Sequence, residues 1–275
     1  MPHPSVPFSW LTAASDDLPA IAAETLLLSA ARAVRERGRA DVVLTGGSLG
    51  IDMLRALPEM RPRLLPDADL APVHLWWGDE RFVPHEDAER TSSQARAAWG
   101  ESMRGAQLHL LPAPASGSAP HELAAAAAAY ARELSAVHDF DIVFLGMGPD
   151  GHIASLFPGH CQVLDESADV LAETHSPKPP ALRASMSVSR LLRTELLVLL
   201  FSGESKRTAA RTLLRGCAVE LTRHEEHSAV RLSEALVAPV FTPEERLELP
   251  ARSVISESTV VLTDCSAAEL MSGGG

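Results

Sequence analysis

The chain has 275 residues, of which 46% are hydrophobic and 22% are charged, and its formal net charge is -12. These values are typical of a globular protein with a sizeable core. The acidic balance argues against nucleic acid or an anionic membrane as the main partner. The sequence has no apolar run of about 18 residues and no basic and apolar N-terminal leader, so we expect neither a membrane span nor a signal peptide.

The three cysteines, Cys161, Cys217 and Cys265, are odd in number and lie far apart. This spacing supports neither a disulfide framework nor a zinc ribbon, and it fits a reducing compartment. We therefore expect a cytoplasmic protein that holds no metal.

Apolar positions at helical spacing predict a first helix over residues 17–37, which Gly38 ends. Further along the chain, short apolar or β-branched runs predict strands, and segments of helical spacing or high alanine content predict helices. In chain order these are a strand at 41–45, a helix from Leu49, a strand at 71–77, helices at 91–103 and 121–136, strands at 141–145, 169–173, 182–188 and 195–201, a helix at 202–214, strands at 252–256 and 259–263, and a final helix.

Strands that alternate with helices form right-handed βαβ units, so the pattern predicts an α/β fold with a mostly parallel sheet flanked by helices. No internal repeat or clear linker divides the chain, and we expect a single domain over residues 1–272. Residues 217–248 are charged and poorly patterned, which favours a surface excursion with some helix. The tail at 273–275 is expected to be disordered.

The segment at 141–159, DIVFLGMGPDGHIASLFPG, carries the strongest functional signal. A buried strand is followed by three glycines in six residues, Gly148 among them, and glycines let backbone N–H groups approach a ligand closely. Asp150 and His152 stand in the same loop, and these side-chain types are common in proton transfer at neutral pH. Ligands of α/β enzymes bind at the carboxyl ends of parallel strands, so this loop is a candidate catalytic site.

A second loop, Gly46-Gly47-Ser48, follows the strand at 41–45 and precedes a helix. Free N–H groups and the helix dipole at such a position favour a phosphate. A plain tight turn explains the same residues, and the spacing is that of neither a Walker loop nor a dinucleotide fingerprint.

Charged residues follow two further strands. Asp79-Glu80-Arg81 is either a self-neutralising surface cluster or a guanidinium held ready for a phosphate or carboxylate. Lys178 lies between two prolines, Arg183 follows it, and Lys206 lies in the first turn of a helix, where a cation opposes the helix dipole. That local conflict suggests a bound anion.

With these motifs in order, the chain resembles the 6-phosphogluconolactonase family of the pentose phosphate pathway. The motifs that carry the resemblance are LTGGSLG near 45, WWGDERFVP at 76–84, LGMGPDGHIASLFPG at 145–159, SPKPPALR at 176–183 and FSGESK at 201–206. The resemblance implies a modified Rossmann-like sheet shared with glucosamine-6-phosphate deaminases and ribose-5-phosphate isomerases. It also implies hydrolysis of 6-phospho-D-glucono-1,5-lactone to 6-phosphogluconate, with no metal or organic cofactor.

The residues then take hypothetical roles. His152 is the candidate base that activates water, and either Asp150 or Asp79 holds its tautomer. Backbone N–H groups of the loop 146–151 are candidates for an oxyanion hole. The candidate substrate-binding residues are Gly46, Gly47, Ser48, Asp79, Arg81, Gly148, Lys178, Arg183 and Lys206.

Three positions depart from the family pattern: Leu49, Thr91 or Ser92, and Ala184-Ser185 stand where a threonine, an asparagine and Ile-Thr are usual. We expect these three positions to touch the pocket lining and to influence affinity, but none of the changes removes a charged group assigned to the chemistry.

Two other functions remain open, a sugar-6-phosphate isomerase or deaminase and a non-catalytic sugar-phosphate sensor. The deaminases follow the glycine loop with Asn-Glu-Pro, whereas this chain has Ser155-Leu156-Phe157-Pro158 and no carboxylate there. We expect a phosphosugar lactone as the partner and a monomeric protein, and weak association with pathway dehydrogenases is left open.

Overall fold

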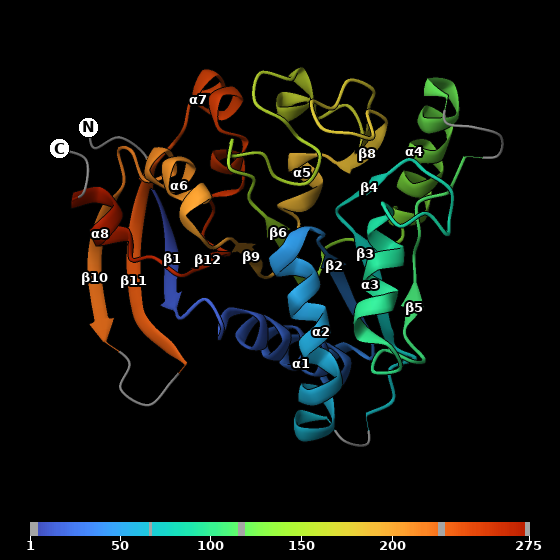
Figure 1. The fold of residues 1–275 in the computed structure, drawn as a ribbon, viewed down its shortest axis with the longest axis horizontal. Coiled ribbons are helices and arrows are strands. Elements are labelled where there is room, and N and C mark those ends of the chain that lie inside the picture. The colour runs from blue at the N-terminus through green and yellow to red at the C-terminus, as the bar shows by residue number, and fades with distance from the viewer. Residues whose placement is uncertain (1–4, 66–67, 115–118, 225–228, 273–275) are drawn as a thin grey trace.

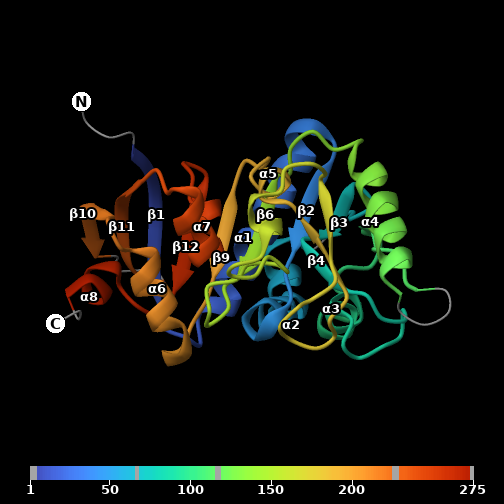
Figure 2. The same cartoon turned by 90° about the horizontal axis from the view of Figure 1, so that it is seen from above.

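The computed structural model of the chain describes residues 5–65, 68–114, 119–224 and 229–272. Strands from all parts of the described chain join in one nine-stranded sheet. In spatial order these strands are β10 (Ala218–His224), β11 (Val230–Pro239), β1 (Ser5–Ala13), β12 (Thr259–Thr263), β9 (Leu197–Leu200), β6 (Ile142–Gly146), β2 (Ala40–Leu44), β3 (Val73–Trp77) and β5 (Gln107–Leu108) (Figure 1). Figure 2 shows the same succession from above.

Neighbouring strands from β1 to β5 are all parallel, and only β11 and β10 are antiparallel to their neighbours. The expected mostly parallel α/β fold is therefore confirmed. The chain passes from β2 to β3 on one side and later returns to β6 on the other side of β2. Such a reversal of strand order leaves a crevice at the carboxyl ends of the strands, where ligands of open α/β sheets bind.

Both faces of the sheet are covered by helices. Neighbouring side chains of a strand point to opposite faces, so each strand contributes to two cores. Val42 and Leu44 of β2 belong to one core, which contains residues of α1 (Leu18–Arg37), α2 (Gly47–Leu64) and α3 (Thr91–Trp99). Val43 belongs to the opposite core. That core contains residues of α4 (Pro120–Leu134), α5 (Val188–Leu191), α6 (Arg207–Leu213), α7 (Pro243–Glu248) and α8 (Ala267–Ser272).

A second, three-stranded sheet lies beside the main one. It has the order β4 (Asp79–Arg81), β8 (Arg183–Met186) and β7 (Val170–Glu173), and both of its strand pairs are antiparallel. Single 3-10 turns form at Cys161–Leu164, Glu204–Lys206 and Pro250–Val254. The sheet brings Asp79 and Arg81 of one sequence motif against Ser185 and Arg183 of another.

The predicted surface excursion at 217–248 is wrong for most of its length, because β10 and β11 extend the main sheet and, among the residues of this segment that the structure describes, only those of α7 are helical. The predicted strand at 252–256 is also wrong, since Pro250 starts a 3-10 turn there. No strand was predicted at Ser5–Ala13, where Pro7 lies outside the stretch of β1 that pairs with β12. The predicted disordered tail at 273–275 lies outside the described residues, and the single domain stays a prediction.

Candidate active site

A cavity of about 200 Å³ opens where the loops after β2, β3 and β6 meet. We call it the central cavity. It gathers side chains from segments that lie far apart in the sequence, as expected for one edge of a parallel sheet. Its lining includes the predicted residues Gly46, Gly47, Asp79, Arg81, Gly148, His152, Lys178, Arg183 and Lys206, together with Thr45, Thr91, Gly146, Met147, Pro149 and Ala154.

Two predicted residues stand elsewhere. Asp150 does not line the central cavity, but its carboxylate contacts Nδ1 of His152. Ser48 is exposed and lines a neighbouring groove between α2 and α3 together with Arg55 and Gln94. The structure therefore does not bring Ser48 into the same cavity as the other candidates.

His152, Asp150 and Lys178 lie in contact at one wall. Nδ1 of His152 is hydrogen-bonded to Oδ1 of Asp150, and Nζ of Lys178 lies 3.1 Å from that ring nitrogen and 3.5 Å from Oδ2 of Asp150. Because Nδ1 cannot donate to the carboxylate and accept from the ammonium at once, the contact with Asp150 assigns the proton to Nδ1. Nε2 then carries a lone pair, and it has no hydrogen-bond partner among the described residues.

The surroundings favour a neutral imidazole at pH 7. Burial lowers the pKa of His152, and the charge of Lys178 lowers it further, while Asp150 and Asp79 act in the opposite direction. Burial would raise the pKa of Asp150, but the hydrogen bond from His152 and the charges of His152 and Lys178 outweigh this effect and lower it. Burial, reinforced by Lys178, also lowers the pKa of Lys206.

Gly148 makes room for the histidine. A Cβ atom at this position would lie 1.9 Å from Nδ1 of His152 and 2.5 Å from Oδ1 of Asp150, so any side chain would displace the pair. Among the N–H groups of the loop 146–151, which the sequence suggested as oxyanion donors, that of Met147 donates to the carbonyl of Leu200 and only that of Asp150 has no acceptor among the described residues. The N–H groups of Gly146, Gly148 and Gly151 already donate to Thr45 Oγ1, to the carbonyl of His152 and to the carbonyl of Gly148.

The N-terminus of α2 faces the cavity without a cap. Gly46 is the N-cap residue, no side chain bonds to the first turn, and Gly46 and Gly47 line the cavity. The first N–H groups of a helix have no partner within the helix, and with the dipole they attract an anion.

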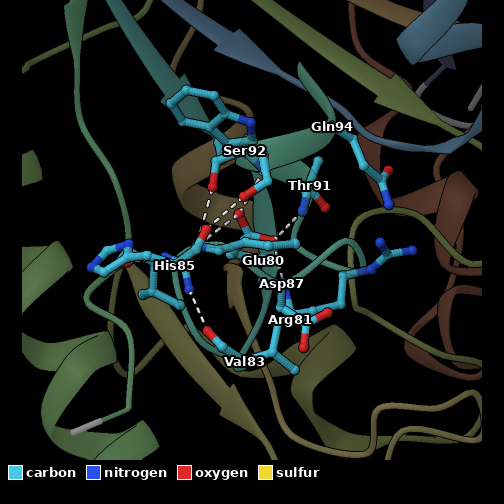
Figure 3. Close-up of polar contacts among 12 residues, drawn as sticks. Glu80, Arg81, Val83, His85, Asp87, Thr91, Ser92 and Gln94 are labelled. Carbon is cyan, nitrogen blue, oxygen red and sulfur yellow. Dashed lines mark hydrogen bonds and ion pairs between the residues drawn. The ribbon is translucent and has the colours of Figure 1, made fainter. Parts of the chain in front are cut away.

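The N-terminus of the neighbouring helix α3 is already occupied by a buried carboxylate, that of Glu80. It accepts hydrogen bonds from the backbone N–H groups of Thr91 at 2.7 Å, Ser92 at 2.9 Å and Arg81 at 2.9 Å. Figure 3 shows Glu80 at the start of α3, with Arg81 extending away from it on the side of Gln94. Glu80 thus fixes the backbone of Arg81, whose guanidinium donates to the carbonyl of Glu89 at 2.7 Å while the residue lines the cavity.

Asp79 and Arg183 are held by partners of their own. Ser155, which is fully buried, donates its hydroxyl to Oδ2 of Asp79 at 2.6 Å, so Asp150 and not Asp79 contacts the histidine ring. Arg183 donates to the carbonyls of Lys178 at 3.0 Å and Pro179 and Pro180 at 3.1 Å. Arg183 therefore fixes the loop that carries Lys178 while it lines the cavity.

Thr91 and Ala154 were not among the candidate site residues, although the position of Thr91 or Ser92 was expected to touch the pocket lining. Ala154 adopts a positive φ of 47°, which is rare for a residue other than glycine, between the fully buried Ile153 and Ser155. Neither residue belongs to a charged or glycine-rich motif, and for Thr91 the signal was only an unusual residue at its position.

Comparison with known proteins identifies the family. Residues 13–239 match the family described as glucosamine-6-phosphate isomerases/6-phosphogluconolactonase. The chain belongs to this family. The 6-phosphogluconolactonase of Streptomyces coelicolor is 40% identical over 207 residues, which cover 71% of this chain and 78% of that protein.

Solved structures show the same fold at low identity. A 6-phosphogluconolactonase from Trypanosoma cruzi is similar with a TM-score of 0.76 and 20% identity over 98% of each chain. A monomeric glucosamine-6-phosphate deaminase is similar with a TM-score of 0.67 and 19% identity over 95% of this chain and 99% of that one. Because a lactonase and a deaminase share the fold, the site must decide between them.

None of the described helices is both long and apolar enough to cross a membrane. In the same part of the chain, no three His, Cys, Asp or Glu side chains are grouped so that they could hold a metal ion.

Proposed function

We propose that the chain hydrolyses 6-phospho-D-glucono-1,5-lactone to 6-phospho-D-gluconate, a step of the pentose phosphate pathway. One observation carries this proposal: a single cavity combines a His152–Asp150 pair with an uncapped helix N-terminus and several cations. The pair suits proton transfer, and the cationic end suits a phosphate. In a chain with a net charge of -12, such a local group of cations is what an anionic substrate needs.

In this proposal the phosphate binds at the first turn of α2, with Arg81, Arg183 and Lys206 as its charged partners. Anchoring the remote end of the substrate orients the lactone carbonyl and lowers the entropic part of the barrier. Asp79, a carboxylate among cations, accepts hydrogen bonds from sugar hydroxyls and would repel a phosphate.

The chemical step is assigned to His152. Its Nε2 takes a proton from water while the water oxygen bonds to the lactone carbonyl carbon, and Asp150 stabilises the resulting imidazolium through Nδ1–H. The bond from that carbon to the ring oxygen then breaks, and the proton on Nε2 passes to the ring oxygen. Because every loop N–H group except that of Asp150 is engaged, we assign stabilisation of the oxyanion to Lys178, the cation next to His152.

The segment after His152 disfavours isomerisation or deamination. Leu156 and Phe157 are fully buried, and the hydroxyl of Ser155 is bound to Asp79, so these residues offer no acid to the cavity. Those reactions need a second proton-transferring group at this point, as the family's Asn-Glu-Pro element implies.

The test is a lactonase assay in which 6-phosphogluconolactone is generated in place and its loss is compared with spontaneous hydrolysis. The wild type should accelerate the reaction, and His152→Ala should lower kcat by about 10²–10⁴. His160→Ala is the matched control, since His160 contacts the same Phe157 ring but pairs with Glu173. Full activity of His152→Ala would refute the base assignment, and a wild type without activity would refute the function.

A further inference from the structure

Thr91 places a hydroxyl group at the wall of the central cavity. The residue starts α3, is 1% exposed and lines the central cavity. Its backbone N–H donates to Glu80, but its Oγ1 has no hydrogen-bond partner among the described residues. Buried polar groups are nearly always paired, so an unpaired one on a cavity wall points to a ligand.

The position of this hydroxyl links it to the uncapped helix. A Cβ atom at Gly46 would lie 3.0 Å from Cγ2 and 3.3 Å from Oγ1 of Thr91. The absence of a side chain at residue 46 therefore lets Thr91 pack closely against the N-cap of α2. Its hydroxyl stands beside the free N–H groups of the first turn of α2.

Glu80 limits which groups of α3 are available to bind an anion. Its carboxylate accepts hydrogen bonds from the N–H groups of Thr91 and Ser92. The N–H group of Ser93 has no acceptor among the described residues, but Ser93 does not line the central cavity. The negative charge of Glu80 also offsets the dipole of α3. What α3 can still present to an anion in the cavity is the side chain of Thr91.

We propose that Thr91 is a phosphate-binding residue, whose hydroxyl donates a hydrogen bond to a phosphate oxygen docked on the N-terminus of α2. The inference rests on the proposed phosphate site but does not depend on hydrolysis. It adds a neutral donor from a second helix to a site otherwise made of cations and backbone N–H groups, so the phosphate is bound between α2 and α3.

Calorimetric binding of two probes, 6-phosphogluconate and inorganic phosphate, tests the proposal. Thr91→Val keeps the shape and removes the hydroxyl, Thr91→Ser keeps the hydroxyl, and Thr91→Ala removes it without adding a second methyl group. We expect Thr91→Val and Thr91→Ala to raise the dissociation constants of both probes by a similar factor, roughly 10-fold to 100-fold for a lost hydrogen bond to a charged group. Ser should bind both probes within about threefold of the wild type, and thermal unfolding verifies that each variant is folded.

Three outcomes would overturn the proposal. Unchanged binding by Thr91→Val and Thr91→Ala would show that the hydroxyl does not contact the ligand. Weaker 6-phosphogluconate binding with unchanged phosphate binding would place Thr91 on the sugar. If Thr91→Ser lost as much probe binding as Thr91→Ala, the loss would be due to the missing methyl group and not to the hydroxyl. A wild type that binds both probes but does not hydrolyse the lactone would refute the proposed function and leave this site intact.

Discussion

The N-termini of α2 and α3 lie beside each other. Each has backbone N–H groups without acceptors inside the helix, and the two helices differ in what is available to accept from them. At α3, the protein supplies its own anion, Glu80, to the free N–H groups. At α2, two glycines leave the N–H groups uncapped at a cavity. A third helix follows the first pattern, since the fully buried Glu234 accepts from Ala267 and Ala268 at the start of α8. A helix start that holds its own carboxylate is structural, and one without it is available for a ligand.

Removing the carboxylate at α3 should have the largest effect on stability. Glu80→Ala leaves two buried N–H groups and one partly buried N–H group without an acceptor, and we expect a loss of about 2–4 kcal/mol in the free energy of unfolding. Denaturant titration measures it. Glu86→Ala, at an exposed glutamate of the same loop, is the control and should change stability by less than about 0.5 kcal/mol. Equal effects of the two substitutions would contradict the role of Glu80.

The His152–Asp150 pair at the other wall of the cavity should show itself in the pH profile. A base acts when it is unprotonated, and burial lowers the pKa of His152, so kcat/KM of the wild type should fall only as the pH drops below about 6.5.

Asp150→Asn removes a charge that raises this pKa, so the acid limb should move to still lower pH. The plateau should fall by at least about tenfold, because the tautomer is no longer held. A limb that moves to higher pH would contradict the assignment.

Adding an anion to α2 should sharpen the contrast between the helices. Ser48→Asp places a carboxylate in the first turn of α2 outside the central cavity. We expect unfolding to cost about 0.3–1 kcal/mol more at low salt, and inorganic phosphate to bind more weakly. Ser48→Asn, which adds no charge, is the control. If phosphate binding stays the same in Ser48→Asp, the anion does not bind at α2.

The smallest expected effect is a change in stability on substitution of Ala154. Its positive φ is strained for alanine and ordinary for glycine, so Ala154→Gly should raise the free energy of unfolding by roughly 0.5–1 kcal/mol. Thermal unfolding would detect the change. A destabilised variant would show that the alanine methyl group contributes more than the backbone strain costs.

The sequence allowed the parallel sheet and most of the cavity lining to be predicted, because glycines and charged residues directly follow apolar strands. It did not reveal β1, whose two partner strands, β11 and β12, come from the other end of the chain. It also left open which aspartate holds His152, since Asp79 is removed from that role by a serine 76 residues away. The sequence placed Thr91 or Ser92 at the pocket lining but gave neither a role, because only packing brings Thr91 against Gly46.

The most direct test of the contrast between the helices is a ¹H–¹⁵N correlation spectrum recorded during titration with 6-phosphogluconate. The account predicts that the amides of Gly46, Gly47 and Ser48 at α2 shift strongly and saturably, as expected when N–H groups gain an anionic acceptor. The amides of Ser92 and Ala268, whose acceptors are Glu80 and Glu234, should change little. Shifts concentrated at Ser92 or Ala268, with none at Gly46 and Gly47, would contradict the central claim.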